Sequence, residues 1–412
     1  MVTGVARRLW TLGARPDARV AIVMAPSTEW VVAWHALQRL GAVAAPLDHR
    51  ATPAETENRL AALDPALVLR DPAEVAAATE SDLTELAWRD DPADVACIVH
   101  TSGTSGRPRP IELTHANLSA SAIGSAARIG ISPSDRWLCC MPLHHVGGMM
   151  VPVRCAIFGT SVAIEPFDPE RIGRALAEQP ITLASLVPTM LARLLDVGVE
   201  PGGLRWVLLG GGPASPALIE RALDAGFPVA PTYGLTESAS QIAAIAPWEV
   251  HAHPGSVGAP FFHTDVRISG EGRIAIRGPS VAPASTAADG WLETGDLGRI
   301  DGNGHLHVLG RADDVIVSGG ENISPEEVES VLLSHPAVAD AAVAGRPDPE
   351  WQTAVVAYVV ANDASPSSEE LRSFCRERLS GPKVPKAFEL VTELPRNAQG
   401  KLLRGELGSR SV

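Results

Sequence analysis

A polar loop in the first third of the chain has the composition of a phosphate-binding segment. Its residues are Thr101, Ser102, Gly103, Thr104, Ser105, Gly106, Arg107, Pro108 and Arg109. The loop follows the apolar run DVACIVH, which predicts a strand, and a helical pattern begins near Thr114. Backbone N–H groups, hydroxyls and arginines in such a loop can bind phosphate. The spacing is not that of a Walker loop, and a flexible polar connection is the alternative interpretation.

Other reactive side chains give weaker indications. The adjacent His144 and His145 could suggest a metal site, but no cysteine or carboxylate lies at ligand spacing from them in the sequence, so we expect no metal there. The five cysteines are an odd number and show no CxxC spacing. We therefore expect them to be reduced and buried.

The elements that position these residues can be read from hydrophobic patterns. Short β-rich runs alternate with helical patterns from Arg19 to about Val187, which predicts an α/β fold with parallel strands. Apolar residues at three- and four-residue spacing predict a helix over Thr28–Leu40, and Gly41 would end it. Short runs separated by Gly, Asp and Asn turns from Gly255 to Gly310 indicate antiparallel β structure.

A small C-terminal α+β domain is expected after Arg311. Ser324, Pro325 and Glu327 have the spacing of a helix start, with a capping serine, a proline at the first helical position and a glutamate three residues after the serine.

Composition narrows the class of protein. The length of 412 residues suggests two domains, and 45% hydrophobic with 20% charged residues is typical of a soluble globular protein. The net charge of -14 argues against a general nucleic-acid binder. Arg39 and Arg154 interrupt the most apolar stretches well short of the roughly 20 residues that a membrane span needs. The start, MVTGVARRLW, lacks a signal peptide's apolar core, so we expect a cytoplasmic protein.

The loop at 101–109 resembles a signature of the adenylate-forming superfamily, which includes acyl- and aryl-CoA synthetases. Further motifs resemble that superfamily's in the same order: YGLTE (Tyr233–Glu237), TGD (Thr294–Asp296), GRADD (Gly310–Asp314), SGGENISPEEVE (Ser318–Glu329) and PRNAQGK, which ends at Lys401. The resemblance implies a ligase that forms an acyl-adenylate from ATP and a carboxylic acid and then transfers the acyl group to a thiol, with ATP, Mg²⁺ and CoA as cofactor and substrates.

The same resemblance implies a domain organisation. Residues 1–310 would form a large ATP- and acid-binding domain with parallel-sheet α/β layers and a β-rich subdomain, and residues 311–412 a small mobile domain. Superfamily members usually carry several dozen more residues before the position that matches Met1, so we expect a shortened N-terminal part.

By this resemblance, phosphate and metal contacts come from two segments. Thr101 to Arg109 would hold the β- and γ-phosphates, and Tyr233 and Gly234 would belong to the nucleotide site. Thr236 would contact phosphate, and Glu237 would help to bind Mg²⁺, which prefers hard oxygen ligands.

The resemblance also implies the nucleoside contacts. Gly211, Gly212 and Pro213 would lie against adenine, because a segment without side chains lets the ring approach the backbone. Asp296 would accept hydrogen bonds from the ribose hydroxyls, with Arg311 beside it. An ordinary strand-to-helix turn for the glycines and a turn role for Asp296 are the alternatives.

In the C-terminal domain, the resemblance makes Lys401 the mobile lysine that stabilises charge during adenylation. Asp313 matches the hinge about which the domain rotates before thioester formation. Gly319 and Gly320 would line the pantetheine tunnel, with a simple tight turn as the alternative.

MPLHHVGG, at Met141–Gly148, resembles the superfamily's acyl-pocket motif, and His145 would act as a gate. Ser240 and Gln241 would supply hydrogen-bond donors to the acid. Three segments resemble the o-succinylbenzoate-CoA ligases of menaquinone synthesis: YGLTESASQIA, ESVLLSHPAVADAAVAG, and the stretch from CRERL to NAQGKLLR.

Several alternatives stay open at this stage. Another aryl- or acyl-CoA ligase, an adenylating partner of a carrier protein and a non-catalytic nucleotide or acid sensor all fit parts of the sequence. Arg109 and Pro110 stand where the superfamily normally has lysine and glycine, which predicts weaker ATP contact. The oligomeric state is also open, with a homodimer as one alternative.

Overall fold

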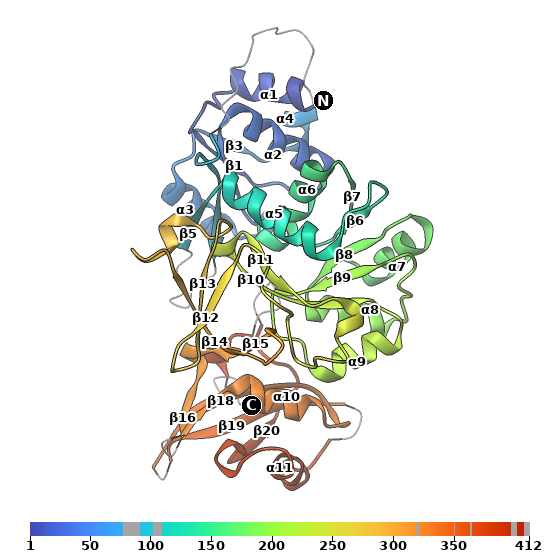
Figure 1. Cartoon of the computed structure of the whole chain (residues 1–412), viewed down its shortest axis with the longest axis vertical. Helices are drawn as coiled ribbons and strands as arrows, with labels where there is room; N and C mark the ends of the chain where they lie inside the picture. Colours follow the sequence, from blue (N-terminus) through green and yellow to red (C-terminus); the bar gives the residue numbers. More distant parts are fainter. Residues whose placement is uncertain are drawn as a thin grey trace.

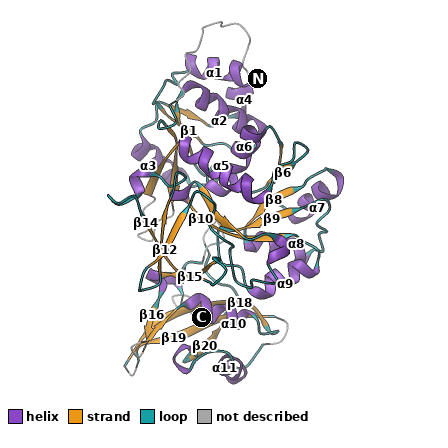
Figure 2. Cartoon of the chain, in the orientation of Figure 1, coloured by secondary structure: helices purple, strands orange, loops and turns teal. Residues whose placement is uncertain are grey.

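The computed structural model describes residues 1–76, 91–101, 109–318, 321–349, 351–362, 365–396 and 402–407. Figure 1 shows a large body that contains the N-terminus and a smaller part at the other end of the long axis, which follows β15 (Leu306–Arg311). Helices pack on sheets in both parts (Figure 2), which confirms the predicted mixed α/β fold class. The boundary predicted after residue 310 falls at the end of β15 and stays a prediction.

The first sheet lies next to the N-terminus. Its strand order is β3 (Leu67–Leu69), β1 (Arg19–Ile22), β2 (Val43–Pro46), β4 (Val95–Thr101) and β5 (Arg109–Thr114). Neighbouring strands are parallel, except that β5 is antiparallel to β4. The helices of this region are α1 (Val2–Thr11), α2 (Thr28–Leu40), α3 (Pro53–Leu63) and α4 (Pro72–Ala76).

Helix α2 confirms the prediction for Thr28–Leu40. The Ser27 side chain accepts a hydrogen bond from the backbone N–H of Trp30, and Gly41 ends the helix with a left-handed φ of 65°. Trp30 and Trp34 are buried and stack with their ring centroids 5.6 Å apart. The apolar face of the pattern therefore packs into the core as the spacing predicts.

The second sheet forms the middle of the molecule. Its strand order is β11 (Ser240–Ala244), β10 (Val229–Leu235), β9 (Trp206–Leu209), β8 (Leu183–Leu186), β6 (Arg136–Cys139) and β7 (Ser161–Ile164). Its helices are α5 (His115–Ile129), α6 (Val146–Phe158), α7 (Pro169–Glu178), α8 (Pro188–Asp196) and α9 (Pro216–Asp224). Every residue of β8 and β9 is buried, as expected for parallel strands covered on both faces.

The third sheet confirms the antiparallel structure predicted between Gly255 and Gly310. Its strands, in order, are β12 (Asp265–Ile268), β13 (Arg273–Arg277), β14 (Leu292–Ile300) and β15, and all neighbours are antiparallel. β14 and β15 lead directly into the smaller part of the molecule (Figure 1).

The smaller part is α+β, as the sequence predicts. It contains the strands β16 (Ile316–Ser318), β17 (Glu321–Ile323), β18 (Val338–Asp348), β19 (Gln352–Ala361) and β20 (Ala387–Leu390), with the helices α10 (Pro325–Leu333) and α11 (Ser368–Arg376). Short 3-10 turns occur throughout the chain: η1 (Thr236–Ser238), η2 (Pro247–Glu249), η3 (Pro283–Ser285), η4 (Ala312–Asp314), η5 (Gly381–Lys383) and η6 (Arg404–Glu406).

Helix α10 begins where predicted, but the serine that precedes it does not cap it. Pro325 is the first helical residue, whereas the Ser324 side chain accepts no hydrogen bond from the helix backbone. Its hydroxyl lies 2.8 Å from the Leu309 carbonyl and 3.0 Å from a Glu326 carboxylate oxygen. Glu327 instead pairs with Lys383 at 2.6 Å. These tertiary partners replace the predicted capping box, and Ser324 ties α10 to β15.

The cysteines are all buried and free, which confirms their predicted role as core residues. Burial raises the pKa of the Cys140 thiol to about 12, so it stays protonated.

No helix in the described ranges is long and apolar enough to cross a membrane.

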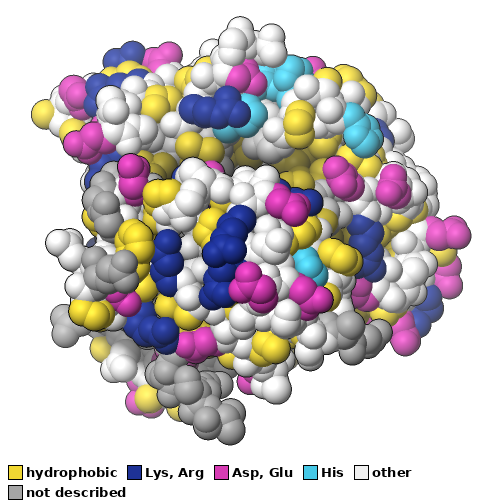
Figure 3. Space-filling view, turned by 90° about the horizontal axis from the view of Figure 1, so that it is seen from below, with side chains coloured by type: hydrophobic (Ala, Val, Ile, Leu, Met, Phe, Trp, Pro, Cys, Tyr) yellow, Lys and Arg dark blue, Asp and Glu magenta, His cyan; other side chains and the backbone are white. Residues whose placement is uncertain are grey.

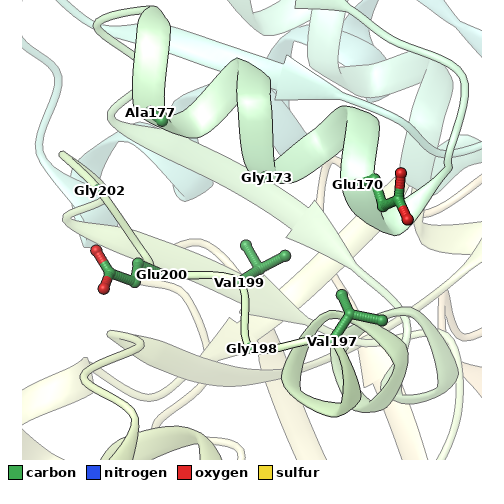
Figure 4. Close-up of a pocket in the computed structure, with 8 residues that line it drawn as sticks. All are labelled: Glu170, Gly173, Ala177, Val197, Gly198, Val199, Glu200 and Gly202. Carbon is green, nitrogen blue, oxygen red and sulfur yellow. The ribbon is translucent and has the colours of Figure 1, made fainter.

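On the face seen from below, Lys and Arg side chains are interspersed with Asp and Glu (Figure 3). A surface hollow of about 400 Å³ lies between α7 and the segment after α8 (Figure 4), with Glu170 and Glu200 among its lining residues. Its lining includes no residue that the sequence places in the active site.

Candidate active site

The predicted phosphate loop joins two paired strands. Thr101, at the end of β4, lies opposite Arg109, at the start of β5, and its hydroxyl is 3.4 Å from the Arg109 carbonyl oxygen. The predicted contacts from Ser102, Gly103, Thr104, Ser105, Gly106 and Arg107 lie outside the described residues. Helix α5 begins at His115 with Thr114 as its capping residue, which confirms the predicted start near Thr114. Between the loop and this helix lies strand β5, which was not predicted from the sequence. Ile111 and Leu113 are buried and Glu112 is exposed, an alternation typical of a strand.

Three motif residues that are distant in the sequence meet where the ends of β10 and β15 lie beside the middle of β14. The Tyr233 hydroxyl donates to Asp296 Oδ2 at 2.5 Å, and Arg311 Nη1 donates to Asp296 Oδ1 at 2.8 Å. Asp296 is buried and pairs with Arg311 in the β14–β15 register. A side chain at Gly295 would meet the Arg311 guanidinium at 2.9 Å, so glycine leaves room for this ion pair.

Tyr233 and Arg311 hold the Asp296 carboxylate in one orientation, and its charge in turn affects the pKa values of both residues. Burial, reinforced by the neighbouring Asp296, raises the pKa of Tyr233, so the phenol remains a hydrogen-bond donor. Burial alone would lower the pKa of Arg311, but attraction to Asp296 outweighs it and the pKa is raised. A carboxylate oxygen accepts more than one hydrogen bond, so Asp296 can still receive hydroxyl donors from a ligand.

The glycine segment predicted at adenine follows β9. Gly211 has a φ of +79°, and Gly211, Gly212 and Pro213 are exposed. β9 and β10 are parallel neighbours, so the segment lies at the same sheet edge as Tyr233. Ligands in open α/β sheets bind at the carboxyl ends of the strands. The geometry fits both the adenine role and an ordinary turn before α9.

Glu237, the predicted Mg²⁺ ligand, lies on the tight turn between β10 and β11. A side chain at Gly234 would lie 1.9 Å from the Ser240 carbonyl oxygen, so only glycine fits at this crossing. The buried Ser238 hydroxyl bonds to the backbone of Leu235 and of Ser240 and closes the turn.

Thr236 and Glu237 are partly exposed on this turn. The Glu237 backbone carbonyl accepts a hydrogen bond from the Ala282 N–H, at 2.7 Å, which fixes the residue. Among the described residues, no hydrogen bond or ion pair occupies the Glu237 carboxylate. A fixed and unengaged hard oxygen donor fits Mg²⁺.

Ser240 and Gln241 are buried, where the sequence placed the acid pocket. Gln241 Oε1 accepts a hydrogen bond from the Ser125 hydroxyl at 3.0 Å. Ser240 Oγ lies 3.4 Å from a guanidinium nitrogen of Arg154, on α6. The predicted acid-binding residues therefore lie beside a cation that the sequence did not assign to them.

Arg154 is unusual because it is buried without a counterion. Its side chain is 2% exposed, its Nε has no hydrogen-bond partner, and no carboxylate in the described part of the chain forms an ion pair with it. Its guanidinium carbon lies 5.4 Å from the centre of the Trp137 ring. Burial lowers the pKa of Arg154 to about 10, so it is cationic at neutral pH. Buried charges are normally paired, which makes this arginine a candidate anion ligand.

His145, the predicted gate, precedes the first residue of α6. Its ring centroid is 4.2 Å from that of His144, and the Nε2 atoms of both are buried without a hydrogen-bond partner. His144 Nε2 lies 3.5 Å from Asp48, which Arg50 contacts at 3.0 and 3.1 Å. Burial lowers the pKa of His144 to about 3 and also lowers that of His145, so both rings are neutral at pH 7.

Asp48 is a carboxylate that sequence spacing could not reveal, because it comes from the segment after β2. Burial alone would raise its pKa, but hydrogen bonds from Arg50 lower the pKa to about 2.

Part of the predicted C-terminal machinery is described. Asp313 lies in η4, between β15 and β16, with its side chain 65% exposed. Ser318 and Glu321 pair across β16 and β17, whereas Gly319 and Gly320 lie outside the described residues. Lys401 also lies outside them, one position before Leu402, which forms a β-bridge with Arg396.

Arg404 anchors the segment that follows Lys401. Its guanidinium donates to Glu329, to Glu326 at 3.1 Å and to the Val343 carbonyl at 2.8 Å. Its Nε also lies 3.4 Å from Asp314, beside the candidate hinge. Burial alone would lower the pKa of Arg404, but the carboxylates around it raise the pKa.

The fold and these motifs define a class of protein. Residues 1–284 match the family model of the AMP-binding enzyme, and residues 327–401 match that of the AMP-binding enzyme C-terminal domain. The chain belongs to the AMP-binding enzyme family, which confirms the superfamily inferred from the motifs.

Within this family, the chain is similar to several 2-succinylbenzoate–CoA ligases. A 2-succinylbenzoate–CoA ligase of Bacillus cytotoxicus is 38% identical, over 98% of this chain and 91% of the relative. A 2-succinylbenzoate–CoA ligase of Bacillus licheniformis is 45% identical, over 76% of this chain and 70% of the relative. The o-succinylbenzoate CoA synthetase (MenE) of Bacillus subtilis, in complex with the acyl-adenylate intermediate OSB-AMP, has a TM-score of 0.88 at 35% identity, covering 99% of this chain and 91% of that one. The same enzyme in complex with ATP and magnesium ion also has a TM-score of 0.88, at 34% identity.

Proposed function

We propose that this chain joins 2-succinylbenzoate to CoA and splits ATP into AMP and pyrophosphate. Its family is that of AMP-binding enzymes, and similar relatives along nearly the whole chain are 2-succinylbenzoate–CoA ligases. The observation that carries the choice of acid is Arg154, a buried cation beside Ser240 that has no counterion among the described residues. A dicarboxylic acid has one carboxylate to activate and a second one to pair with this arginine.

The pocket chemistry favours a dicarboxylate over a fatty acid. A simple fatty acid would leave Arg154 unpaired in the complex, and each unsatisfied buried polar group costs roughly 1–3 kcal/mol, more when it is charged. The ring carboxylate of 2-succinylbenzoate would instead accept a charge-assisted hydrogen bond from Arg154. Gln241, held by Ser125, and the neutral ring of His145 would complete the pocket wall.

The first half-reaction needs an acid carboxylate aligned with the α-phosphate. A carboxylate oxygen attacks that phosphorus in line, the bond to the bridging oxygen breaks, and pyrophosphate leaves with its electron pair. In the proposal, Asp296 and Arg311 fix the ribose, Gly211 to Pro213 lie against adenine, and Thr236 contacts phosphate. Lys401 supplies positive charge where the transition state needs it.

Mg²⁺ would be held by Glu237, whose carboxylate is unengaged among the described residues. When bound, the ion supplies charge neutralisation on the phosphate oxygens. The loop from Thr101 to Arg109 would cover the β- and γ-phosphates.

In the second half-reaction the CoA thiol attacks the acyl carbonyl of the adenylate. The thiol loses its proton, the acyl–phosphate bond breaks, and AMP leaves. Between the two steps the domain orientation would change about Asp313, whose exposed position in η4 lets its backbone rotate without loss of core contacts. Gly319 and Gly320 would then lie along the pantetheine chain.

A cytoplasmic location is part of the proposal, supported by cysteines that are all buried and free. A homodimer stays the alternative to a monomer. Arg109 and Pro110 are exposed on β5, and we expect them to weaken the contact with ATP.

The test is thioester formation with a panel of acids. Purified enzyme with ATP, Mg²⁺ and CoA should convert 2-succinylbenzoate with a kcat/KM well above that for benzoate, 4-chlorobenzoate or octanoate. Pyrophosphate release measured with and without CoA separates a CoA ligase from a partner of a carrier protein. Preference for benzoate or octanoate would reject the assigned acid and leave the ligase class in place. Absence of pyrophosphate release with every acid would favour the sensor alternative.

A further inference from the structure

Two histidines and an aspartate gather at the β14–β15 turn, away from the residues assigned to catalysis. One ligand atom from each of His253, Asp301 and His305 lies within 4.8 Å of the other two, and none of the three residues is fully exposed. The rings of His253 and His305 are 4.1 Å apart between centroids. We propose that these three side chains bind a transition-metal ion of the Zn²⁺ class.

Backbone hydrogen bonds hold the segment that carries His253 next to the segment that carries His305. The His253 N–H donates to the Glu249 carbonyl at 3.1 Å, which sets the turn that carries this histidine. Downstream, the Val257 N–H donates to the Leu306 carbonyl at 2.9 Å, and the Leu306 N–H donates to Gly258 at 2.9 Å. Because His305 directly precedes Leu306, these bonds bring its ring to the His253 ring without requiring the metal. Such a preformed site loses little conformational entropy on binding.

Asp301 is oriented as a metal-binding carboxylate would be. Its Oδ1 accepts the backbone N–H groups of Asn303 and His305 at 2.9 and 3.0 Å. Among the described residues, its Oδ2 accepts only His307 Nε2, at 3.0 Å, which leaves one lone pair for a cation. His307 is in turn fixed by Arg299, at 3.3 Å. Outer partners of this kind orient the ligands of metal sites.

The ligand set selects the kind of ion. Two imidazoles and one carboxylate suit Zn²⁺, Co²⁺, Ni²⁺ or Cu²⁺, with water in the remaining position, whereas Mg²⁺ prefers an all-oxygen shell. The site is also separate from Asp296, the candidate ribose contact. Asp301 lies five residues beyond Asp296 along β14 and its turn, roughly 16 Å at the rise of an extended strand. A bound ion would link the segment before β12 to the two strands that carry Asp296 and Arg311.

The experiment is a Zn²⁺ titration of the chelator-stripped, full-length protein in the presence of excess Mg²⁺. A chromophoric chelator reports the free metal, and Co²⁺ substitution reports the geometry through its visible spectrum. The variants are His253→Ala and His305→Ala. His251→Ala is the matched control, because His251 is exposed in the same segment and is not a member of the cluster.

We expect the wild type and His251→Ala to bind one Zn²⁺ per chain and to gain Tm on binding. Each cluster variant should bind at least about 100-fold more weakly, since loss of even an outer partner costs 10- to 100-fold. Mg²⁺-dependent pyrophosphate release by His253→Ala, without Zn²⁺, should equal that of the wild type and so show that the variant folds. A wild type without Zn²⁺ uptake, or equal uptake by the wild type and a correctly folded His253→Ala, would overturn the proposal.

Discussion

Replacing Arg154 with methionine tests whether this buried cation is present for the substrate. Burial lowers the pKa of Arg154 from its ordinary value to about 10, which corresponds to roughly 3 kcal/mol of desolvation cost that no carboxylate of the described residues offsets in the free enzyme. Methionine has a similar length, is apolar and needs no counterion. We therefore expect Arg154→Met to raise the Tm of the free enzyme by a few degrees, since buried charges are often less stable than apolar replacements.

The same replacement should lower kcat/KM for 2-succinylbenzoate but not for an acid that lacks the ring carboxylate. Losing one partner of a buried charge pair costs about 2–5 kcal/mol, equivalent to a decrease in kcat/KM of about 30-fold to several thousand-fold. The matched substrate is 4-oxo-4-phenylbutanoate, which keeps the succinyl carboxylate, the ketone and the ring but lacks the ring carboxylate. Its kcat/KM should change little or improve in Arg154→Met.

The assay is pyrophosphate release for the two enzymes with the two acids, which isolates the coupling between Arg154 and the ring carboxylate. An equal loss with both acids would show that Arg154 supports the structure or the adenylation step and does not select the acid. A decrease in Tm would contradict the account of an unpaired buried charge.

Three further predictions concern other parts of the molecule. Lys401→Ala should slow adenylate formation by orders of magnitude yet leave the conversion of a supplied acyl-adenylate to thioester nearly intact; equal losses in both half-reactions would remove its assigned role. Arg404→Met should destabilise the C-terminal domain by about 3–5 kcal/mol, because it leaves the buried Glu329 without its cationic partner. The loss should appear as faster proteolysis, whereas the control Arg378→Met, at an exposed ion pair, should change the proteolysis rate little. His144 is neutral in the folded state, with a pKa of about 3. The free energy of unfolding should therefore fall as pH drops below the ordinary histidine pKa of 6.5, and it should continue to fall toward pH 3. Denaturant titrations of His144→Phe should show a smaller decline, and a decline identical to that of the wild type would refute this reasoning.

Local patterns in the sequence predicted the elements well, because periodicity reports which face of a segment is buried. Thr28–Leu40 and the antiparallel strands before Gly310 were predictable for this reason. The strand at Arg109–Thr114 is difficult to predict from the sequence, since Pro110 and the preceding polar loop obscure a short alternation of two buried residues. The capping role predicted for Ser324 is wrong because a tertiary partner, the Leu309 carbonyl, replaces the local cap.

The site was predictable to the extent that its residues lie in recognisable motifs. Tyr233, Asp296 and Arg311 were placed in one nucleotide site by resemblance, and the structure brings them together. Arg154 was visible as a lone charge in an apolar stretch, but its contact with Ser240 spans 86 residues and no local pattern encodes it. Asp48 was hidden for the same reason, because only the fold brings it to His144.

The most direct test of the central claim is a single turnover observed by mass spectrometry. Enzyme in excess over 2-succinylbenzoate, with ATP and Mg²⁺ but no CoA, should form one adenylate and one pyrophosphate per acid consumed. Adding CoA should then replace the adenylate with the CoA thioester and free AMP. Formation of ADP and phosphate, or an adenylate that CoA fails to discharge, would contradict the proposed two-step ligase.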